Sequence, residues 1–227
     1  HKEKGRFPAF ILLMSLVIGL VMLQPDMGTT VIILFEAVII YFLSGGSMYH
    51  FISLVPVLGI LGFFLVKIAP YRLARLTAYL EVDKNIEGSS YHVKQILIAL
   101  GMGGLTGVGL GNSLQKFAYL PENTTDSIFA IIAEEIGLLG SLVLILVMFL
   151  FVYRGFFIAV NVSDKFGKLL AGGLTSFLAI QMLINLGAQT ALIPLTGVPL
   201  PFISYGGSAL IVDLCSVGIL LNISKHV

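Results

Sequence analysis

Long apolar stretches separated by short polar segments organise this chain. A helix needs about 20 mostly apolar residues to cross a bilayer. Six stretches are predicted as spans: Phe7–Leu23, Thr29–Leu43, Phe51–Ala69, Ile128–Val152, Leu169–Leu186 and Ser204–Ile223. A seventh, Val93–Leu105, is shorter, contains Lys94 and Gln95 and runs into glycine-rich sequence, so we interpret it as re-entrant or interfacial. The pattern predicts an all-α polytopic membrane protein with about six transmembrane helices.

The composition indicates the same class of protein. Of the 227 residues, 57% are hydrophobic and only 11% are charged, against about 45–50% apolar and about 25% charged in an average soluble domain. The net charge of +1 and the lack of a Lys/Arg block give no reason to expect nucleic acid as a partner. The chain has one cysteine, Cys215, so it cannot form an intrachain disulfide.

The distribution of Lys and Arg predicts which side of the membrane each loop faces. Six spans put both chain ends on one side, which carries Lys2, Lys4, Arg6, Arg154, Lys165, Lys168 and Lys225. We expect this side to be cytoplasmic, because short cytoplasmic loops are enriched in Lys and Arg. The long outer loop also carries cations, but long loops do not follow the rule strictly. A seven-span alternative would move those cations inside and put the chain ends on opposite sides.

The chain is therefore expected to divide into three parts. These are three transmembrane helices in 1–69, a large extracytoplasmic loop with interfacial or re-entrant helices and the catalytic region in 70–126, and three transmembrane helices in 127–227. Within the loop, Leu73, Leu76 and Tyr79 recur at helical spacing while Arg72 and Arg75 lie on another face. This pattern predicts a helix in the headgroup layer, with its cations toward lipid phosphates.

Ionisable side chains gather at the predicted outer ends of the spans. They are Asp26 after the first span, Arg72 and Arg75 after the third, and Lys116, Glu122 and Asp126 before the fourth. Cations can neutralise charge on a phosphate leaving group, and a carboxylate can accept a proton from an attacking hydroxyl. The group therefore suits a substrate with phosphates and hydroxyls. No His or Cys cluster has the spacing of metal ligands.

Asp126 lies where a polar loop enters the fourth span, and it has two interpretations. With Thr125 it could form an N-cap for the helix that begins near Ile128. Alternatively, it could be a catalytic carboxylate at the surface where water and lipid meet.

Four acids are predicted within spans: Glu36, Glu134, Glu135 and Asp213. A charge at that depth is costly unless it has a partner or a function. Glu134 and Glu135 point about 100° apart on a helix, so at least one is expected to face the bundle and to join a hydrogen-bond network there.

Several separated motifs occur in the order found in one family. They are Gln24-Pro-Asp-Met-Gly-Thr29, Pro70-Tyr-Arg72, Gly109-Leu-Gly-Asn-Ser-Leu-Gln-Lys116, Tyr119-Leu-Pro-Glu122, Thr125-Asp126, Glu134-Glu-Ile-Gly137 and Pro201-Phe-Ile-Ser-Tyr-Gly-Gly-Ser208. On these motifs the chain resembles, over nearly its whole length, the SEDS family, the FtsW/RodA/SpoVE glycosyltransferases that build peptidoglycan. The motif ending at Lys116 is more similar to the FtsW/SpoVE branch than to RodA. Family members typically have ten spans, so we expect this chain to correspond to the C-terminal six.

The chain departs from the family pattern at a few positions. Thr124 and Ser127 stand where His and Phe are common, and Ala191 stands where Gly is usual. Glu36 and Asp213 are acids outside the pattern. These positions bear on how a substrate is held rather than on family membership.

The resemblance implies polymerisation of lipid II. Asp126 would be the general base for a sugar 4-hydroxyl, whose oxygen attacks the anomeric carbon of the growing glycan and expels undecaprenyl pyrophosphate. The site residues it implies are Asp126 as the catalytic residue, Arg72, Arg75, Gln95, Lys116 and Glu122 for substrate binding, and Asp26, Glu134, Glu135 and Ser204 in support.

The same resemblance implies a setting for the reaction. The protein would lie in the bacterial cytoplasmic (inner) membrane with its site facing outward, and it would serve septal wall synthesis during cell division. Its partners would be a class B penicillin-binding protein transpeptidase and other divisome membrane proteins. A divalent cation such as Mg²⁺ is compatible with a pyrophosphate leaving group, although no ligand set in the sequence demands a cofactor.

Two other functions stay open at this point. A flippase or transporter for the lipid-linked precursor would give the mid-span acids a role, although the broken-helix repeats of many transporters are not evident. A non-catalytic scaffold for division proteins is the other alternative.

Overall fold

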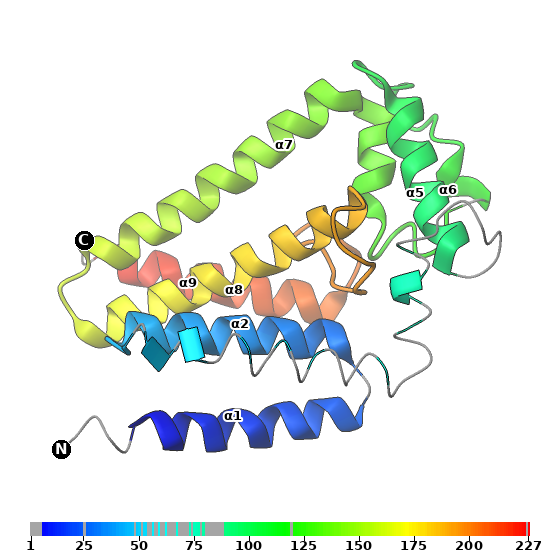
Figure 1. The fold of residues 1–227 in the computed structure, drawn as a ribbon. Coiled ribbons are helices and arrows are strands. Elements are labelled where there is room, and N and C mark those ends of the chain that lie inside the picture. Colours follow the sequence, from blue (N-terminus) through cyan, green and yellow to red (C-terminus); the bar gives the residue numbers. More distant parts are fainter. Residues whose placement is uncertain are drawn as a thin grey trace.

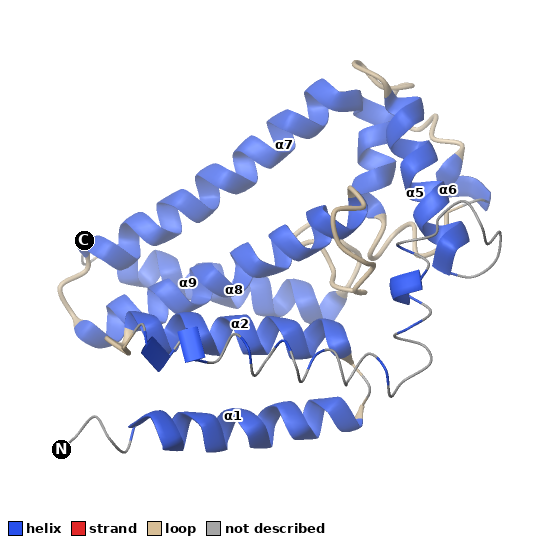
Figure 2. Ribbon diagram, in the orientation of Figure 1, coloured by secondary structure: helices blue, strands red, loops and turns tan. Residues whose placement is uncertain are grey.

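The computed structural model describes residues 6–24, 26–47, 89–118, 120–225 and 227, and between these ranges 49–50, 52–53, 56, 59, 62, 67, 73, 75–77 and 79. Most of the predicted third span, 51–69, lies outside the described residues, as does Arg72. In the described part of the chain every regular element is a helix (Figure 2). The predicted all-α class is confirmed.

The helices follow the predicted apolar stretches, with changes at their ends. They are α1 (Arg6–Leu23), α2 (Met27–Leu43), α5 (Ser89–Gly103), α6 (Gln115–Ala118), α7 (Ile128–Asn161), α8 (Lys165–Gln189) and α9 (Gly207–Ser224) (Figure 1). Among the described helices, α7, α8 and α9 are each long and apolar enough to cross a membrane, and α1 and α2 are shorter apolar helices. The chain is therefore a membrane protein, and its number of spans stays a prediction.

Helix α8 lies at the centre of the bundle and packs against α2, α5, α7 and α9 (Figure 1). Leu178, in the middle of α8, is fully buried. Small residues allow the close approach of its neighbours: a Cβ at Gly155 of α7 would collide with Thr175 of α8, and one at Gly172 of α8 would meet Leu43 of α2. Lipid tails are as apolar as leucine side chains, so the hydrophobic effect does not drive membrane helices together. Close packing of this kind holds them together instead.

Helix α7 is broken at Gly137, where φ is 69° and ψ is −171°. Residues 128–136 run beside α5 in the same direction, and residues 138–161 form the long diagonal segment in Figure 1. The predicted span Ile128–Val152 thus falls within one apolar helix, but that helix has a break at Gly137 which the prediction did not include. The helix extends to Asn161, and its first part is a separate segment packed on α5.

The loop after α5 supplies the hydrogen bonds that α7 loses at the break. Val108 N and Gly109 N donate to the carbonyl oxygens of Glu134 and Glu135, each over 3.0 Å. On the other side of the break, Leu138 N donates to Gly104 O over 2.9 Å and Leu139 N donates to Leu105 O over 3.1 Å. Unpaired backbone groups buried in a membrane are costly, so these four bonds stabilise the break.

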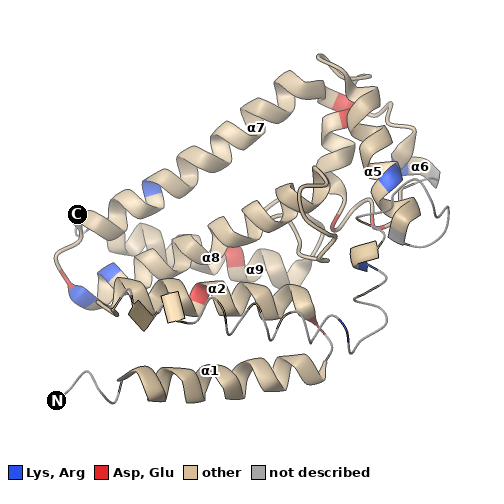
Figure 3. Ribbon diagram, in the orientation of Figure 1, with Lys and Arg blue, Asp and Glu red and all other residues tan. Residues whose placement is uncertain are grey.

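Charged residues occur at both ends of the helix bundle (Figure 3). Lys165 and Lys168 lie in the first turns of α8, beside the end of α7, and the C-terminus lies at the same end (Figures 1 and 3). The loops that contain Asp26 and Asp126 lie at the opposite end. Which end faces the cytoplasm stays a prediction.

Candidate functional site

The loop that carries Asp126 is held from α8 by two side-chain amides. Asn185 Nδ2 donates to the main-chain oxygen of Asp126 over 3.0 Å, and Gln189 Nε2 donates to the same oxygen over 2.6 Å. Both side chains are almost fully buried, at 1% exposure. They lie four residues apart, so both point to one face of α8. One carbonyl thus receives two donors from a central helix.

The segment 200–205 holds the same loop from another side. Ser204 Oγ donates to Thr125 O over 2.6 Å, and Tyr205 N donates to Thr124 O over 2.9 Å. Ser204 Oγ also accepts a hydrogen bond from Leu200 N over 2.7 Å. Ser204, predicted to support the site, therefore ties this segment directly to the residue before Asp126.

A third contact comes from α5. His92 Nε2 and Ser127 Oγ are 2.7 Å apart, and Ser127 is fully buried. Ser127, not Asp126, occupies the N-cap position of α7, and no side-chain cap bond forms there. The N-cap interpretation of Asp126 is therefore wrong, because the helix begins one residue later than capping by Asp126 would require.

The Asp126 carboxylate lies against the backbone of Gly197. A Cβ added at Gly197 would lie 3.4 Å from Asp126 Oδ2, and Gly197 has φ of +77°, a conformation that favours glycine. Gly197 also lines a cavity of about 330 Å³. The carboxylate therefore lies next to this cavity, with only a glycine between them.

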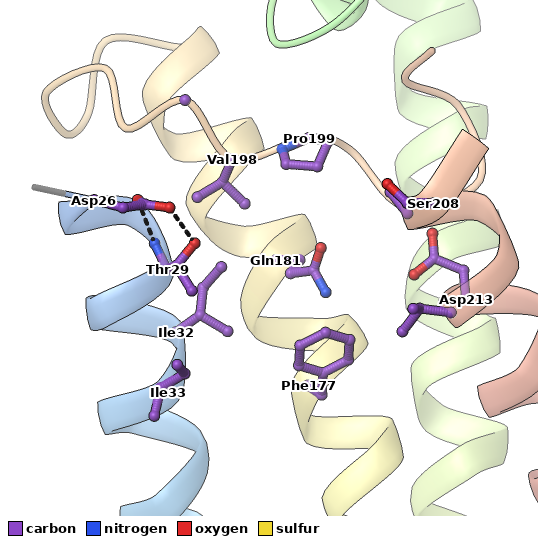
Figure 4. A pocket seen from close by; sticks show the side chains of 13 residues that line it. Asp26, Thr29, Ile32, Ile33, Phe177, Gln181, Val198, Pro199, Ser208 and Asp213 are labelled. Atoms are coloured by element: carbon purple, nitrogen blue, oxygen red, sulfur yellow. Dashed lines mark hydrogen bonds between the residues drawn. The ribbon is translucent and has the colours of Figure 1, made fainter. Parts of the chain in front are cut away.

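The cavity lies between α2, α8, α9 and the loop 197–199 (Figure 4). Its polar lining includes Asp26, Gln181, Ser208 and Asp213, and its apolar lining includes Ile32, Ile33, Phe177 and Val212. Asp26 also caps α2, since its carboxylate accepts from Thr29 N over 3.0 Å and from Thr29 Oγ1 over 2.6 Å. The predicted site residue Asp26 thus lies at the edge of the cavity with a capping role of its own.

Two nearby charges act on Asp126 in opposite directions. Burial raises the pKa of the Asp126 carboxyl, the negative charge of Glu122 raises that pKa further, and the positive charge of Arg75 lowers it. Burial also lowers the pKa of His92, with Glu122 opposing this shift and Arg75 adding to it. The structure therefore brings together three of the predicted site residues, and it adds His92 to them.

Arg75 and Tyr79 contact the loop that follows α8. Arg75 Nη1 donates to Leu195 O over 3.4 Å, and Tyr79 Oη donates to Leu192 O over 3.0 Å. The predicted headgroup helix thus has protein contacts on its polar groups. In the same loop Ala191, where the family usually has glycine, has a φ of 54°, which explains why glycine suits that position.

Lys116, on α6, belongs to a second cluster, which forms where residues 113–116 meet the first part of α7. Its Nζ forms an ion pair of 2.7 Å with Glu135 Oε1. The neighbouring Glu134 is fully buried and accepts hydrogen bonds from Ser113 Oγ and from Leu114 N, the latter over 3.2 Å. Both mid-span acids therefore have partners in the loop after α5, and the charge of Lys116 is neutralised in this structure.

Some residues of the site were not predicted from the sequence. Asn185 and Gln189 follow Gln181 at four-residue spacing along an otherwise apolar helix, and such a polar stripe was the available signal. His92 lies one turn before Gln95, which is half-buried on α5. Nothing near His92 in the sequence indicates that it meets Ser127, which is 35 positions away.

These features define a class of protein: a helical membrane protein with a carboxylate held beside a cavity at one end of its bundle. The family model for FtsW, RodA and SpoVE, described as cell cycle protein, matches residues 1–227. The chain belongs to this family.

Two curated relatives show the extent of the similarity. Stage V sporulation protein E of Bacillus subtilis (strain 168) is 43% identical over 225 residues, which cover 99% of this chain and 61% of that protein. A second protein of the same organism, named "Probable peptidoglycan glycosyltransferase FtsW", is 45% identical over 238 residues, which cover 100% of this chain and 58% of that protein. The chain thus spans about 60% of the length of these relatives.

A solved structure has the same fold. It comes from a study of how a peptidoglycan synthase complex coordinates polymerization and crosslinking, and its matching chain is 27% identical with a TM-score of 0.76. The match covers 95% of this chain and 60% of that chain.

Proposed function

We propose that this chain carries the active site of a peptidoglycan glycosyltransferase that polymerises lipid II, with Asp126 as the general base. Relatives that match nearly the whole chain are named probable peptidoglycan glycosyltransferases. The observation that carries the proposal is the Asp126 carboxylate. Its main chain is held by α8 and by the 200–205 segment, and the carboxylate itself lies beside the cavity across Gly197.

The proposed reaction transfers one glycosyl group. Asp126 removes the proton from the 4-hydroxyl of the acceptor sugar as that oxygen forms a bond to the anomeric carbon of the donor. The bond from the anomeric carbon to the pyrophosphate oxygen breaks, and its electron pair leaves with undecaprenyl pyrophosphate. A base is most effective when its pKa approaches the working pH, and burial and Glu122 move the pKa of Asp126 upward in that direction.

The leaving group carries negative charge, which cations stabilise. Arg75 is the cation that acts on Asp126 within the described residues, and we assign it to the pyrophosphate together with Arg72, which lies outside them. Lys116 could join only by leaving Glu135. Glu122 and Gln95 are proposed to bind the sugars. In the described part of the chain no three His, Cys, Asp or Glu side chains gather into a metal-binding group, so we assign no step to Mg²⁺.

The proposed setting is the bacterial cytoplasmic membrane, with six spans in this chain, both ends inside and Asp126 outside. The separation of Lys165 and Lys168 from Asp126 at opposite ends of the bundle supports this orientation. The similarity to a chain of a solved peptidoglycan synthase complex supports a class B penicillin-binding protein as partner. Relatives named FtsW support a role in division.

The test is polymerisation of labelled lipid II by the full-length protein with its partner. Asp126→Asn keeps the shape of the side chain but removes the base, and we expect a loss of about 10²–10⁴-fold in rate, the usual contribution of general base catalysis. Asp164→Asn is the matched control. Asp164 caps α8 at the other end of the bundle, and asparagine caps equally well, so this variant should retain wild-type activity. Undiminished polymer formation by Asp126→Asn would overturn the proposal.

One observation favours the flippase alternative. Glu36 lines an apolar cavity of about 410 Å³ between α2 and α8, and its buried Oε2 has no hydrogen-bond partner among the residues that the structure describes. An ion-coupled carrier would use such an acid. Glu36→Gln should then abolish movement of lipid II across liposomes while leaving polymerisation intact. If movement persists in this variant, the alternative loses its support.

A further inference from the structure

Asp213 is a buried acid that the proposed reaction does not use. It lies in the second turn of α9, is only 3% exposed, and lines the cavity beside Asp126 (Figure 4). Its Oδ2 accepts a hydrogen bond from Phe202 N over 3.2 Å. The sequence places Asp213 outside the family motifs, so its partner is known only from the structure.

Phe202 has a backbone conformation that contacts from outside the 200–205 segment must stabilise. Its φ is +65°, a left-handed conformation that is strained for an aromatic residue and persists only where the surroundings hold it. The carboxylate of Asp213, on α9, accepts a hydrogen bond from the N–H of Phe202. The Phe202 ring packs edge-on against Phe151 of α7, with ring centroids 5.6 Å apart. The turn at Phe202 is thus held by two helices.

The turn at Phe202 directs the rest of the segment onto the Asp126 loop. Ser204 Oγ accepts from Leu200 N over 2.7 Å across the turn and donates to Thr125 O over 2.6 Å. Tyr205 N donates to Thr124 O over 2.9 Å. Both contacts require the backbone of the segment to turn back at Phe202, so a loosened turn would release two of the bonds that fix the loop.

We propose that Asp213 is a positioning residue for Asp126, acting through the 200–205 segment. This inference rests on the proposed function and assigns Asp213 no contact with the substrate. The role needs a hydrogen-bond acceptor of the right length and does not need a negative charge. Asparagine at the same place can supply that acceptor through its side-chain oxygen, whereas an apolar residue cannot.

The experiment compares variants of the full-length protein with its partner in the lipid II assay, measuring kcat and KM separately. Asp213→Val should lower kcat by about 10–100-fold with KM within about 2-fold of wild type, because displacing a catalytic group by about 1 Å can cost about 10²-fold. Asp213→Asn should stay within about 3-fold of wild type. Ser216→Ala is the matched control. Ser216 is also buried on α9, but among the described residues its side chain bonds only to Val212 O of its own helix, so kcat should not change.

A coupling measurement keeps the test independent of folding losses. If Asp213 and Ser204 act through one segment, the double variant Asp213→Ala/Ser204→Ala should be no slower than the slower of its two single variants, whereas independent effects would multiply. If thermal melting shows that Asp213→Val does not fold, Asp213→Ala replaces it, because alanine is less apolar than valine. A wild-type kcat for Asp213→Val or Asp213→Ala would overturn the proposal. A raised KM together with a low kcat for Asp213→Asn would also overturn it, because that result would indicate that the negative charge of Asp213 contacts the substrate.

Asp126→Asn is measured alongside to separate the two proposals. If Asp126→Asn polymerises lipid II normally, the proposed function falls and the positioning role falls with it. If Asp126→Asn is inactive while Asp213→Val keeps the wild-type kcat, only the positioning role falls.

Discussion

Three successive main-chain carbonyls, those of Thr124, Thr125 and Asp126, accept hydrogen bonds from distant parts of the chain. The donors come from Tyr205, Ser204 and the amides of α8. By contrast, none of the described residues forms a hydrogen bond to the Asp126 carboxylate. The loop is thus ordered through its backbone, and the side chain stays available to react. Because the loop is already ordered before substrate binds, it does not have to lose conformational entropy during the reaction.

The charges around Asp126 predict opposite effects of two substitutions on the pH dependence. The base must be ionised, so activity falls as the pH drops through its pKa. Glu122 raises that pKa and Arg75 lowers it. Glu122→Gln should therefore move the acidic limb of the kcat/KM profile to lower pH, and Arg75→Gln should move it to higher pH. Initial rates of lipid II polymerisation across a pH series measure both shifts.

Lys168→Gln provides the control for these shifts. Lys168 is exposed near the start of α8, at the end of the bundle opposite Asp126. Its loss should leave the acidic limb in place. Shifts of Glu122→Gln and Arg75→Gln in the same direction would contradict the assignment of the limb to Asp126.

The sequence predicted only some of the residues of the candidate site and few of their contacts. Asp126 was predicted because a lone carboxylate at a loop–helix junction is visible in local sequence. Its partners Asn185 and Gln189 are 59 and 63 positions away, so no local pattern links them. Lys116 was predicted as a substrate ligand, and its pairing with Glu135 depends on how α6 packs against α7, which local sequence does not encode.

At the scale of elements, the first segment of α7 and the break that follows it connect the Asp126 loop to the membrane helices. The segment 128–136 begins two residues after Asp126 and ends just before Gly137, where the loop after α5 supplies hydrogen-bond partners for its last carbonyls. The orientation of this segment, and with it the start of α7, depends on that junction. A continuous helix would point the residues before Ile128 in another direction.

Gly137→Ala should therefore destabilise the protein. The φ of +69° is strained for alanine, and a Cβ there would collide with the backbone of Thr106 and Gly107. The φ strain alone costs about 1–3 kcal/mol, so we expect a clear fall in the thermal unfolding midpoint of the purified full-length protein.

Gly101→Ala is the matched control for this prediction. Gly101 lies on α5, and a Cβ there would meet nothing within 4 Å. Alanine is favoured over glycine inside a helix by about 1 kcal/mol, so this variant should melt at the wild-type temperature or slightly above it. Equal midpoints for Gly137→Ala and wild type would show that the break does not need its glycine.

At the scale of the whole molecule, the apolar outer surface of the helices separates the two ends of the bundle. Apolar side chains such as Leu146 and Phe149 are exposed on the outer surface of α7, as expected of a helix in contact with lipid or with further helices. The cations of the α7–α8 connection lie at one end, and the Asp126 loop lies at the other (Figure 3). The proposed orientation follows from this separation.

Cysteine labelling tests the orientation in cells, starting from a Cys215→Ala background. Leu192 is exposed in the loop after α8, and Ser163 is exposed between α7 and α8. Leu192→Cys should react with a membrane-impermeant maleimide in intact cells with a permeable outer layer. Ser163→Cys should react only after the cytoplasmic membrane is opened. The reverse pattern would overturn the orientation and the outward placement of Asp126.

The sequence by itself determined the helical class, the membrane location, the family and the place of Asp126 at the mouth of a helix. Each of these depends on the lengths of apolar runs or on short motifs, which are properties of neighbouring residues. Only the tertiary structure decided where α7 breaks, that Asn185, Gln189 and Ser204 hold the Asp126 loop, and that Asp213 meets Phe202. These features depend on which distant backbone groups meet once the helices pack. A buried polar group must find such a partner, but the sequence does not say which one.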